Sequence, residues 1–197
     1  MKIACVDTIT PGNSMEERFQ NLEKWGFDGI EIWGVVGEEG ELDTMAKQVQ
    51  ELSASYKIKP ACVVIASPAA LAPFTEEFLE SKLFAVKESI RIAAKLGAVT
   101  LYAMEEGAQS VPAISEAPTP SDEEREVMLK FFREAGKYAV DQGAILTLEP
   151  VNRYETHYIN RVDQAIEICD TLGLESLKVM ADSCELNMEE SNISQAI

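Results

Sequence analysis

Positive charge is scarce in this sequence. Its 197 residues include 17 lysines and arginines against 34 aspartates and glutamates, which gives a formal net charge of −17 at pH 7. A surface with this balance repels phosphate backbones and anionic lipid headgroups, because its field has the same sign as theirs. We therefore expect neither nucleic acid nor a membrane among the partners of the protein.

Long hydrophobic runs and paired cysteines are also missing. No apolar stretch approaches the roughly 20 residues that span a bilayer. The first residues, Met1 to Val6, enter a strand pattern without the architecture of a signal peptide. The cysteines lie far apart, without the spacing of a disulfide framework or a zinc site, at Cys5, Cys62, Cys169 and Cys184. These absences predict a cytoplasmic protein with reduced thiols.

Nucleotide-binding motifs are absent as well. Neither G-x-G-x-x-G nor a P-loop follows the first apolar run, so a dinucleotide or nucleotide site has no support. The composition, with 46% apolar and 26% charged residues, is that of a globular protein with a sizeable core.

The sequence does contain a repeated unit of strand and helix. Short apolar runs alternate with segments whose hydrophobic residues recur at helical spacing. Ser14 and Glu17 predict a capping box at the first helix, and Ala165, Ile166 and Cys169 are the expected buried face of the fifth. The expected strands are Ile3–Val6, Gly29–Trp33, Ala61–Ala66, Ala98–Met104, Ala144–Leu148 and Leu177–Ala181, and a sixth helix is expected to begin within Met188–Ile197.

Strict alternation of this kind predicts a parallel sheet with right-handed crossovers. One unit takes roughly 35 residues. Eight units would need about 280 residues, in line with the roughly 250 or more of a (β/α)8 barrel. The expected fold class is therefore α/β, of the TIM-barrel type, with about six of the eight βα units. No shift in composition marks a second domain, so residues 1–197 are expected to form a single, incomplete barrel domain.

The stretch from Ala144 to Arg161 combines a short apolar run with a polar loop. A buried strand ends there at Glu149, and Pro150 stops the pairing because it has no amide hydrogen. A polar loop, residues 152–158, follows. A carboxylate at the end of a parallel strand, followed by a polar loop, is where α/β enzymes place their chemistry.

Carboxylates mark other strands too. Asp7, Glu105 and Asp182 stand at strand ends, and Glu31 lies inside the second strand. In a barrel these ends meet at one mouth, where like charges repel unless a cation or protons intervene. Oxygen ligands suit Mg²⁺ or Mn²⁺. The alternative is that each acid caps a helix or faces water, and we favour it for Asp7 and Glu105.

Three motifs resemble those of the sugar isomerase/epimerase group, which includes ketose 3-epimerases and has the xylose isomerase-like TIM-barrel fold. The signature Leu-Glu-Pro-x-Asn-Arg-(Phe/Tyr)-Glu-Thr is similar to residues 148–156, Leu-Glu-Pro-Val-Asn-Arg-Tyr-Glu-Thr. Residues 26–33, Gly-Phe-Asp-Gly-Ile-Glu-Ile-Trp, resemble the second strand of the group. Residues 181–190 stand where the group has Asp-Thr-Phe-His-Met-Asn and an acidic helix start.

The resemblance implies a divalent-metal-dependent isomerase or epimerase that moves a proton beside the carbonyl of a ketose or related sugar, free or phosphorylated, through an enediolate. Glu149 would be a metal ligand and the catalytic acid/base, and Asp182 a second ligand, with Mn²⁺ as the expected ion and Mg²⁺ or Co²⁺ as alternatives. Substrate contacts are expected from Glu155, Glu185, His157 and Trp33.

Two departures from the group affect this expectation. Glu185 replaces the usual histidine three residues after the aspartate. The remaining ligands of the group, a histidine and a glutamate of strands seven and eight, have no counterpart, so we expect no turnover by this chain alone. Unpaired edge strands also predict either aggregation or self-association as a homo-oligomer.

Two other functions are alternatives to this one. A zinc endonuclease of the endonuclease IV type shares the fold, but its histidine-rich, DNA-binding site disagrees with a single histidine, His157, and a charge of −17. A non-catalytic open α/β module, or an inactive fragment of the enzyme, is the other alternative. Metal dependence of thermal stability would separate a non-catalytic module from the enzyme.

Overall fold

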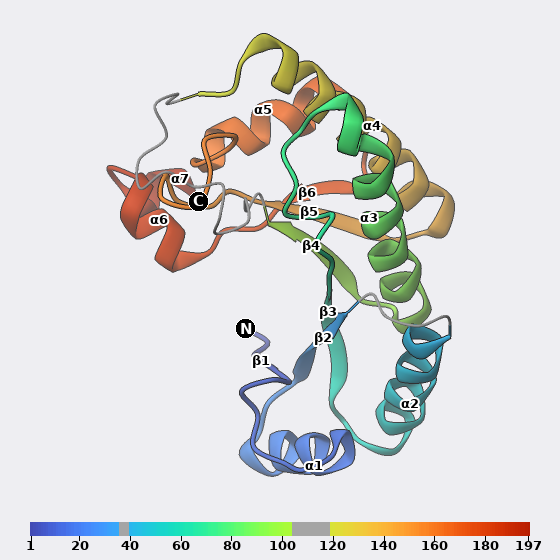
Figure 1. Ribbon diagram of the computed structural model, residues 1–197. Coiled ribbons are helices and arrows are strands. Elements are labelled where there is room, and N and C mark those ends of the chain that lie inside the picture. The colour runs from blue at the N-terminus through green and yellow to red at the C-terminus, as the bar shows by residue number, and fades with distance from the viewer. Residues whose placement is uncertain (36–39, 104–118) are drawn as a thin grey trace.

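The computed structural model describes residues 1–35, 40–103 and 119–197. Within them one sheet contains six parallel strands in the order β1-β2-β3-β4-β5-β6, each followed by a helix (Figure 1). The predicted alternation of strand and helix is thereby confirmed. The strands are β1 Ala4–Val6, β2 Gly29–Val35, β3 Lys59–Ala66, β4 Val99–Ala103, β5 Ile145–Glu149 and β6 Leu177–Val179; the helices are α1 Met15–Trp25, α2 Glu41–Ser55, α3 Glu76–Leu96, α4 Asp122–Gln142, α5 Val162–Leu172, α6 Ser183–Glu189 and α7 Ile193–Ala196.

Local sequence signals account for most helix ends. Ser14 caps α1 by accepting the backbone N–H of Glu17 at 3.2 Å. The predicted capping box is incomplete, because the Glu17 carboxylate accepts the N–H of Asn13 at 2.7 Å and not that of Ser14. A complete box forms at α4, between Ser121 and Glu124. Gly26 ends α1 at a φ of 81°, a left-handed conformation that only glycine adopts without strain.

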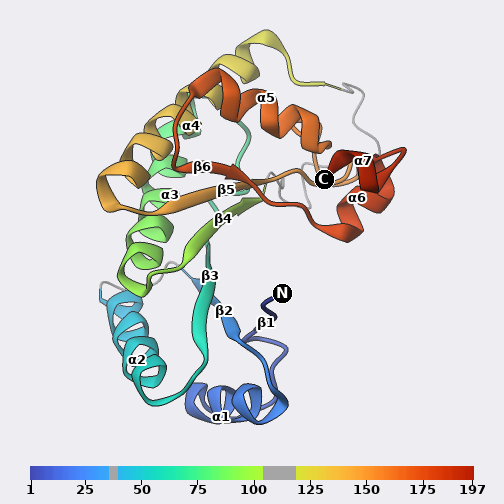
Figure 2. The same ribbon diagram turned by 180° about the vertical axis from the view of Figure 1, so that it is seen from behind.

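The sheet separates a covered face from a more open one. Helices α1 to α5 lie along the outer side of the curved sheet (Figures 1 and 2). Val63 and Ile65 of β3 are buried beneath these helices, whereas their neighbours Cys62 and Val64 point to the inner face and are half-buried. This alternation follows from the two-residue period of a strand. The inner face is therefore the side on which polar strand residues can meet a ligand.

The junction between β3 and β4 is the shortest in the sheet. Pairing covers only Cys62 with Val99 and Val63 with Thr100, where the Thr100 hydroxyl also donates to the carbonyl of Val63 at 2.8 Å. By comparison, β2 and β3 stay paired along the whole of β2. Helix α3 packs on both β3 and β4 and so spans the junction.

Several predicted details are corrected by the structure. On α5, Ile166 is 44% exposed and Ile168 is buried in its place. Strand β6 ends at Val179, and the helix expected from about Met188 is instead a short helix that begins at Ser183, followed by α7. Glu105 lies outside the described residues. None of the helices in the described ranges is long and apolar enough to cross a membrane.

Candidate active site

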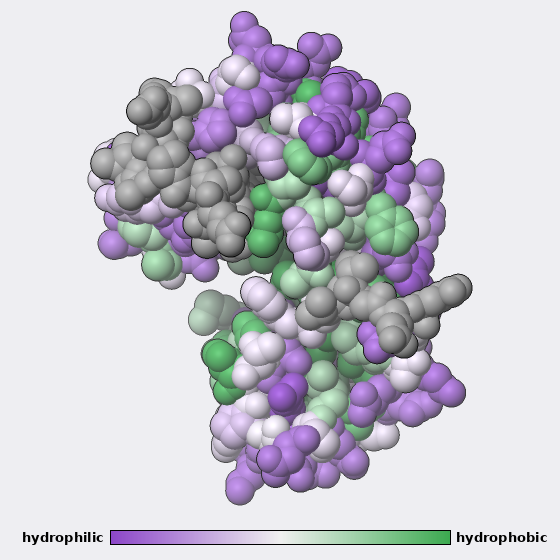
Figure 3. Space-filling view, viewed as in Figure 1, coloured by the Kyte–Doolittle hydropathy of each residue, from purple (hydrophilic) through white to green (hydrophobic). Residues whose placement is uncertain are grey.

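A cavity of about 380 Å³ opens at the carboxyl ends of the middle strands. Its wall includes Trp33 of β2, Ala66 of β3, Ala103 of β4 and Glu149 of β5, together with the segment 67–71 after β3. Most of the lining is apolar, and hydrophobic residues gather along the hollowed middle of the face seen in Figure 3. A largely apolar pocket with a few polar groups is the usual form of a small-molecule site. The structure thus brings together two of the predicted site residues, Glu149 and Trp33.

Glu149 is the acid of this cavity. It ends β5, pairs with Ala103 of β4 and is 8% exposed. Burial raises the pKa of the Cys62 thiol to about 12, and the negative charges of Glu31 and Glu149 add to the effect. Glu31 pairs with Cys62, Cys62 with Val99 and Val99 with Ile145, so the two-residue period of the strands places Glu31, Cys62 and Glu149 on the same, inner side of the sheet. That face is consequently negative and favourable for a cation.

Hydrogen bonds hold both the indole ring and the backbone of Trp33 at the cavity. Its side chain is 46% exposed, and the indole N–H donates to Glu31 Oε1 at 2.7 Å. Its backbone N–H donates to Asp7 Oδ1 at 3.0 Å. Asp7 is itself buried, and its other oxygen accepts from Arg18 Nη1 at 3.1 Å. Asp7 therefore ties β1 to β2 and α1, and the expectation that it caps a helix or faces water is wrong.

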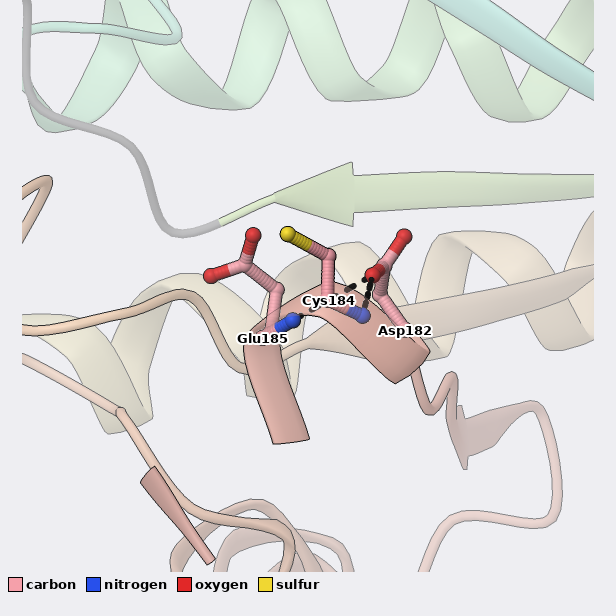
Figure 4. A group of neighbouring side chains, drawn as sticks. All are labelled: Asp182, Cys184 and Glu185. Atoms are coloured by element: carbon pink, nitrogen blue, oxygen red, sulfur yellow. Dashed lines mark hydrogen bonds between the residues drawn. The ribbon is translucent and has the colours of Figure 1, made fainter. Parts of the chain in front are cut away.

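Asp182 caps α6 and also belongs to a cluster of potential metal ligands. Its Oδ1 accepts the N–H groups of Cys184 at 2.6 Å and Glu185 at 3.3 Å, so it is the N-cap of the helix. Ligand atoms of Asp182, Cys184 and Glu185 also lie within 4.8 Å of one another, and the three side chains project to the same side of α6 (Figure 4). In the described part of the chain, Glu149 does not join a cluster of this kind. Cys184 was not among the predicted site residues, although it lies between the predicted residues Asp182 and Glu185 in the sequence.

Glu185 reaches back to the loop after β5. Its Oε2 accepts the backbone N–H of Asn152 at 2.5 Å and the Asn152 Nδ2 at 2.8 Å. Asn152 Nδ2 also donates to Glu155 Oε1 at 2.8 Å, and Asn152 Oδ1 accepts the N–H of Tyr154 at 2.9 Å. Asn152 is 3% exposed, so its amide is used in full by protein groups. The predicted substrate ligands Glu155 and Glu185 are thereby joined through one amide.

Glu189 of α6 and its C-cap, Glu190, also accept hydrogen bonds from the chain that follows β5. Glu189 accepts the backbone N–H of Arg153 at 2.8 Å and pairs with the guanidinium of Arg153, with Nη2 at 2.7 Å from Oε2. Burial alone would raise the pKa of Glu189, but the hydrogen bonds from Arg153 hold it below its usual value. Glu190 accepts the N–H of Val162 at 3.0 Å. Helix α6 is thus fastened to the loop between β5 and α5 at several points.

His157 is held at the far end of that loop. Its Nε2 lies 3.2 Å from Glu124 Oε1, and its ring packs on Tyr158 with centroids 4.3 Å apart. Although burial would raise the pKa of Glu124, hydrogen bonds from Ser121 and from His157 lower it. The structure therefore places His157 against the start of α4, and His157 is not part of the cluster around Asp182.

Sequence reasoning missed a buried lysine behind the cavity. Lys82 of α3 is 1% exposed, and its Nζ donates to the carbonyl of Ala70 at 2.6 Å and to the Tyr102 hydroxyl at 3.0 Å. The same Nζ lies 4.3 Å from the centroid of the Phe74 ring. Ala70 and Tyr102 both line the cavity, so Lys82 supports its wall. A lysine on a helix ordinarily faces water, so no pattern in the sequence marks Lys82 as buried.

The donor chemistry of the site fits a hard divalent ion. Glu149, Asp182 and Glu185 offer carboxylate oxygens, the ligands that Mg²⁺ and Mn²⁺ prefer. One oxygen of Asp182 is engaged as a helix cap and one of Glu185 by Asn152, which leaves the second oxygen of each carboxylate to meet an ion. The Cys184 thiol is a softer donor and fits such an ion less well.

Comparison with known proteins identifies the family. The profile of the xylose isomerase-like TIM barrel matches residues 19–196. The 3-dehydro-D-guloside 4-epimerase of Escherichia coli is 26% identical over all of this chain and 74% of its own length. A probable ketose 3-epimerase of Synechocystis is 22% identical over 90% of this chain and 60% of its own. A D-psicose 3-epimerase of Enterocloster bolteae is 36% identical over 66 residues.

Solved structures agree with this assignment. The crystal structure of a 3-keto-D-glucoside 4-epimerase from Escherichia coli superposes with a TM-score of 0.85 at 23% identity, over all of this chain and 73% of that protein. An L-ribulose 3-epimerase superposes with a TM-score of 0.77 at 19% identity, over all of this chain and 65% of that protein. The chain thus spans about 60 to 74% of these sugar epimerases. It belongs to the xylose isomerase-like TIM-barrel family.

Proposed function

We propose that the protein is a divalent-metal-dependent sugar epimerase whose central acid is Glu149. The observation that carries the proposal is the position of this carboxylate: it ends a central strand and lines a cavity of about 380 Å³. The cavity lies at the carboxyl ends of the strands, where enzymes of this fold act. The relatives that match most of the chain are named as sugar epimerases.

Each site residue has a part in this proposal. Glu149 and Asp182 would hold the ion, preferentially Mn²⁺, and the bound ion would polarise a sugar carbonyl. Glu149 takes the proton from the carbon beside that carbonyl, which leaves an enediolate, and epimerisation follows when a second acid/base group returns a proton on the opposite face. Glu155 binds sugar hydroxyls, and Trp33 provides an apolar surface for the sugar ring. Glu149 is 8% exposed and therefore lies in a medium of low dielectric constant, where a carboxylate interacts strongly with nearby charges.

Calorimetric titration with Mn²⁺ tests the central residue. Wild type should bind the ion, and Glu149→Gln, which keeps the size of the side chain, should bind at least about tenfold more weakly. Glu51→Gln is the matched control, since Glu51 is an exposed acid of α2. Equal affinities of wild type and Glu149→Gln would remove Glu149 from the metal site.

The reaction itself has two candidate forms. The first is 3-epimerisation of a free ketose, as the names of the Synechocystis and Enterocloster relatives indicate for those proteins. The second is 4-epimerisation of a keto-glycoside, and the apolar cavity favours it, because Pro68, Leu71 and Leu101 offer a surface to an aglycone. Since no turnover is expected of this chain alone, binding titrations with D-psicose, and with methyl and phenyl 3-keto-glucosides, distinguish them. A preference for the phenyl glycoside supports the second form.

A further inference from the structure

We infer that Glu185 is a positioning residue: through Asn152, it fixes the Glu155 carboxylate that is to meet the sugar. The inference deepens the proposed function and rests on it for the role of Glu155. It gives Glu185 a task different from direct contact with substrate. Among the described residues, the hydrogen bond to Glu155 Oε1 comes from the side-chain amide of Asn152, and Glu185 orients that amide.

Asn152 is the connecting group. Its two Nδ2 hydrogens point to two carboxylates, with Nδ2 at 2.8 Å from both Glu155 Oε1 and Glu185 Oε2. The planar amide fixes the angle between these hydrogens, so a carboxylate that holds one of them sets the direction of the other. The Asn152 amide oxygen, which accepts the Tyr154 N–H at 2.9 Å, prevents the amide from flipping. Burial of Asn152 excludes water as a substitute partner.

The choice of a carboxylate at position 185 follows from the same geometry. Glu185 Oε2 accepts two donors of one residue, the backbone N–H of Asn152 at 2.5 Å and Nδ2 at 2.8 Å. A carboxylate oxygen has two lone pairs for this purpose, whereas a neutral histidine ring has a single accepting nitrogen. The histidine that stands here in the motif the sequence resembles could satisfy only one of the two donors. Glu185 is thus suited to hold backbone and side chain of Asn152 together.

The alternative is that Glu185 only fastens α6 to the loop after β5 and does not set the position of Glu155. Glu189 of the same helix also binds the loop, but through Arg153 and without contact to Asn152. If Glu185 only fastened α6 to the loop, loss of Glu189 would have the same effect on Glu155. The two residues therefore form a matched pair for the test.

The experiment follows the side-chain amide of Asn152 by ¹⁵N NMR in wild type, Glu185→Leu, Glu185→Gln and Glu189→Leu, with Asn152→Asp to assign the signals. Glutamine keeps an oxygen with two lone pairs, so Glu185→Gln should retain both hydrogen-bonded proton shifts. In Glu185→Leu both protons should move, including the one bound to Glu155. Glu189→Leu should lower thermal stability but leave both protons in place. If the Glu155-bound proton stays unchanged in Glu185→Leu, the inference is overturned.

Titration of the same samples with D-psicose gives the second readout. We expect Glu185→Leu to weaken binding at least about tenfold, Glu185→Gln less than about threefold, and Glu189→Leu less than about twofold. Equal weakening by glutamine and leucine would mean that the charge of Glu185 acts directly, which contradicts positioning. If wild type does not bind the ketose, the ketose form of the proposed function fails, while the Asn152 signals still decide the role of Glu185.

Discussion

Replacement of Phe74 tests how far the cavity depends on the core behind it. Phe74 is 2% exposed and lies at the end of the segment that carries the cavity residues Ser67, Pro68, Ala70 and Leu71. Its ring packs against four other aromatic rings, at centroid distances of 5.0 Å to Tyr158, 5.4 Å to Phe131, 6.3 Å to Phe132 and 6.4 Å to Tyr102. Its backbone N–H donates to the Tyr158 hydroxyl at 3.0 Å.

Phe74→Ala should destabilise the protein by about 4–5 kcal/mol. Truncation of a buried phenylalanine costs about 3–5 kcal/mol, from lost transfer energy and the cavity left behind. The upper part of that range applies, since each aromatic pair adds roughly 0.5–1.5 kcal/mol and the Lys82 ammonium also loses its ring. A domain with about 5–15 kcal/mol of stability would lose a large fraction of it. Phe74→Leu, which keeps most of the volume, should cost about 1–2 kcal/mol.

Urea unfolding followed by circular dichroism measures the effect. Phe84→Ala is the control, because Phe84, on the following helix α3, is 61% exposed, and its truncation should change stability by less than about 0.5 kcal/mol. Phe74→Ala should in addition weaken ligand binding, as the wall of the cavity loses its support. A loss of less than about 2 kcal/mol in Phe74→Ala would refute the view that this aromatic cluster holds the wall.

Two further predictions concern titrating groups. Arg153 and its hydrogen bonds lower the pKa of Glu189 below 4.5, so the stability gained from this contact is complete at neutral pH and is lost as the pH falls through the lowered value. Unfolding curves of wild type and Glu189→Gln should therefore converge on acidification. Burial raises the pKa of Cys62 to about 12, so iodoacetamide at pH 8 should modify exposed Cys184 first, as peptide mass spectrometry would show, and faster labelling of Cys62 would contradict its burial.

Much of the architecture could be predicted because the signals are local. Glycine and proline mark the ends of strands and helices, and Glu149 follows a buried run directly, so its place at a strand end needed no tertiary information. On α5 the signal was ambiguous. Ile166 and Ile168 are both apolar, and only the position of the helix on the sheet decides which of them is buried.

The contacts of the site were less predictable for a related reason. Asn152 and Glu185 are 33 residues apart, and their hydrogen bonds exist because α6 lies against the loop after β5. The sequence placed Glu185 near the mouth of the site but could not show which side chain it meets. The same holds for Lys82, whose burial depends on the segment from Ser67 to Phe74 folding over it.

The order of the strands has a consequence for how the protein is made. Each strand pairs with the one that precedes it in the chain, so a nascent polypeptide can add one βα unit at a time as it leaves the ribosome. By the time β3 emerges, the most extensively paired strands, β2 and β3, are complete. The next unit joins through only two residue pairs, fewer than at any other boundary in the described sheet. The joining of this unit therefore depends more on the packing of α3 against β4 and α4 than on backbone hydrogen bonds between β3 and β4.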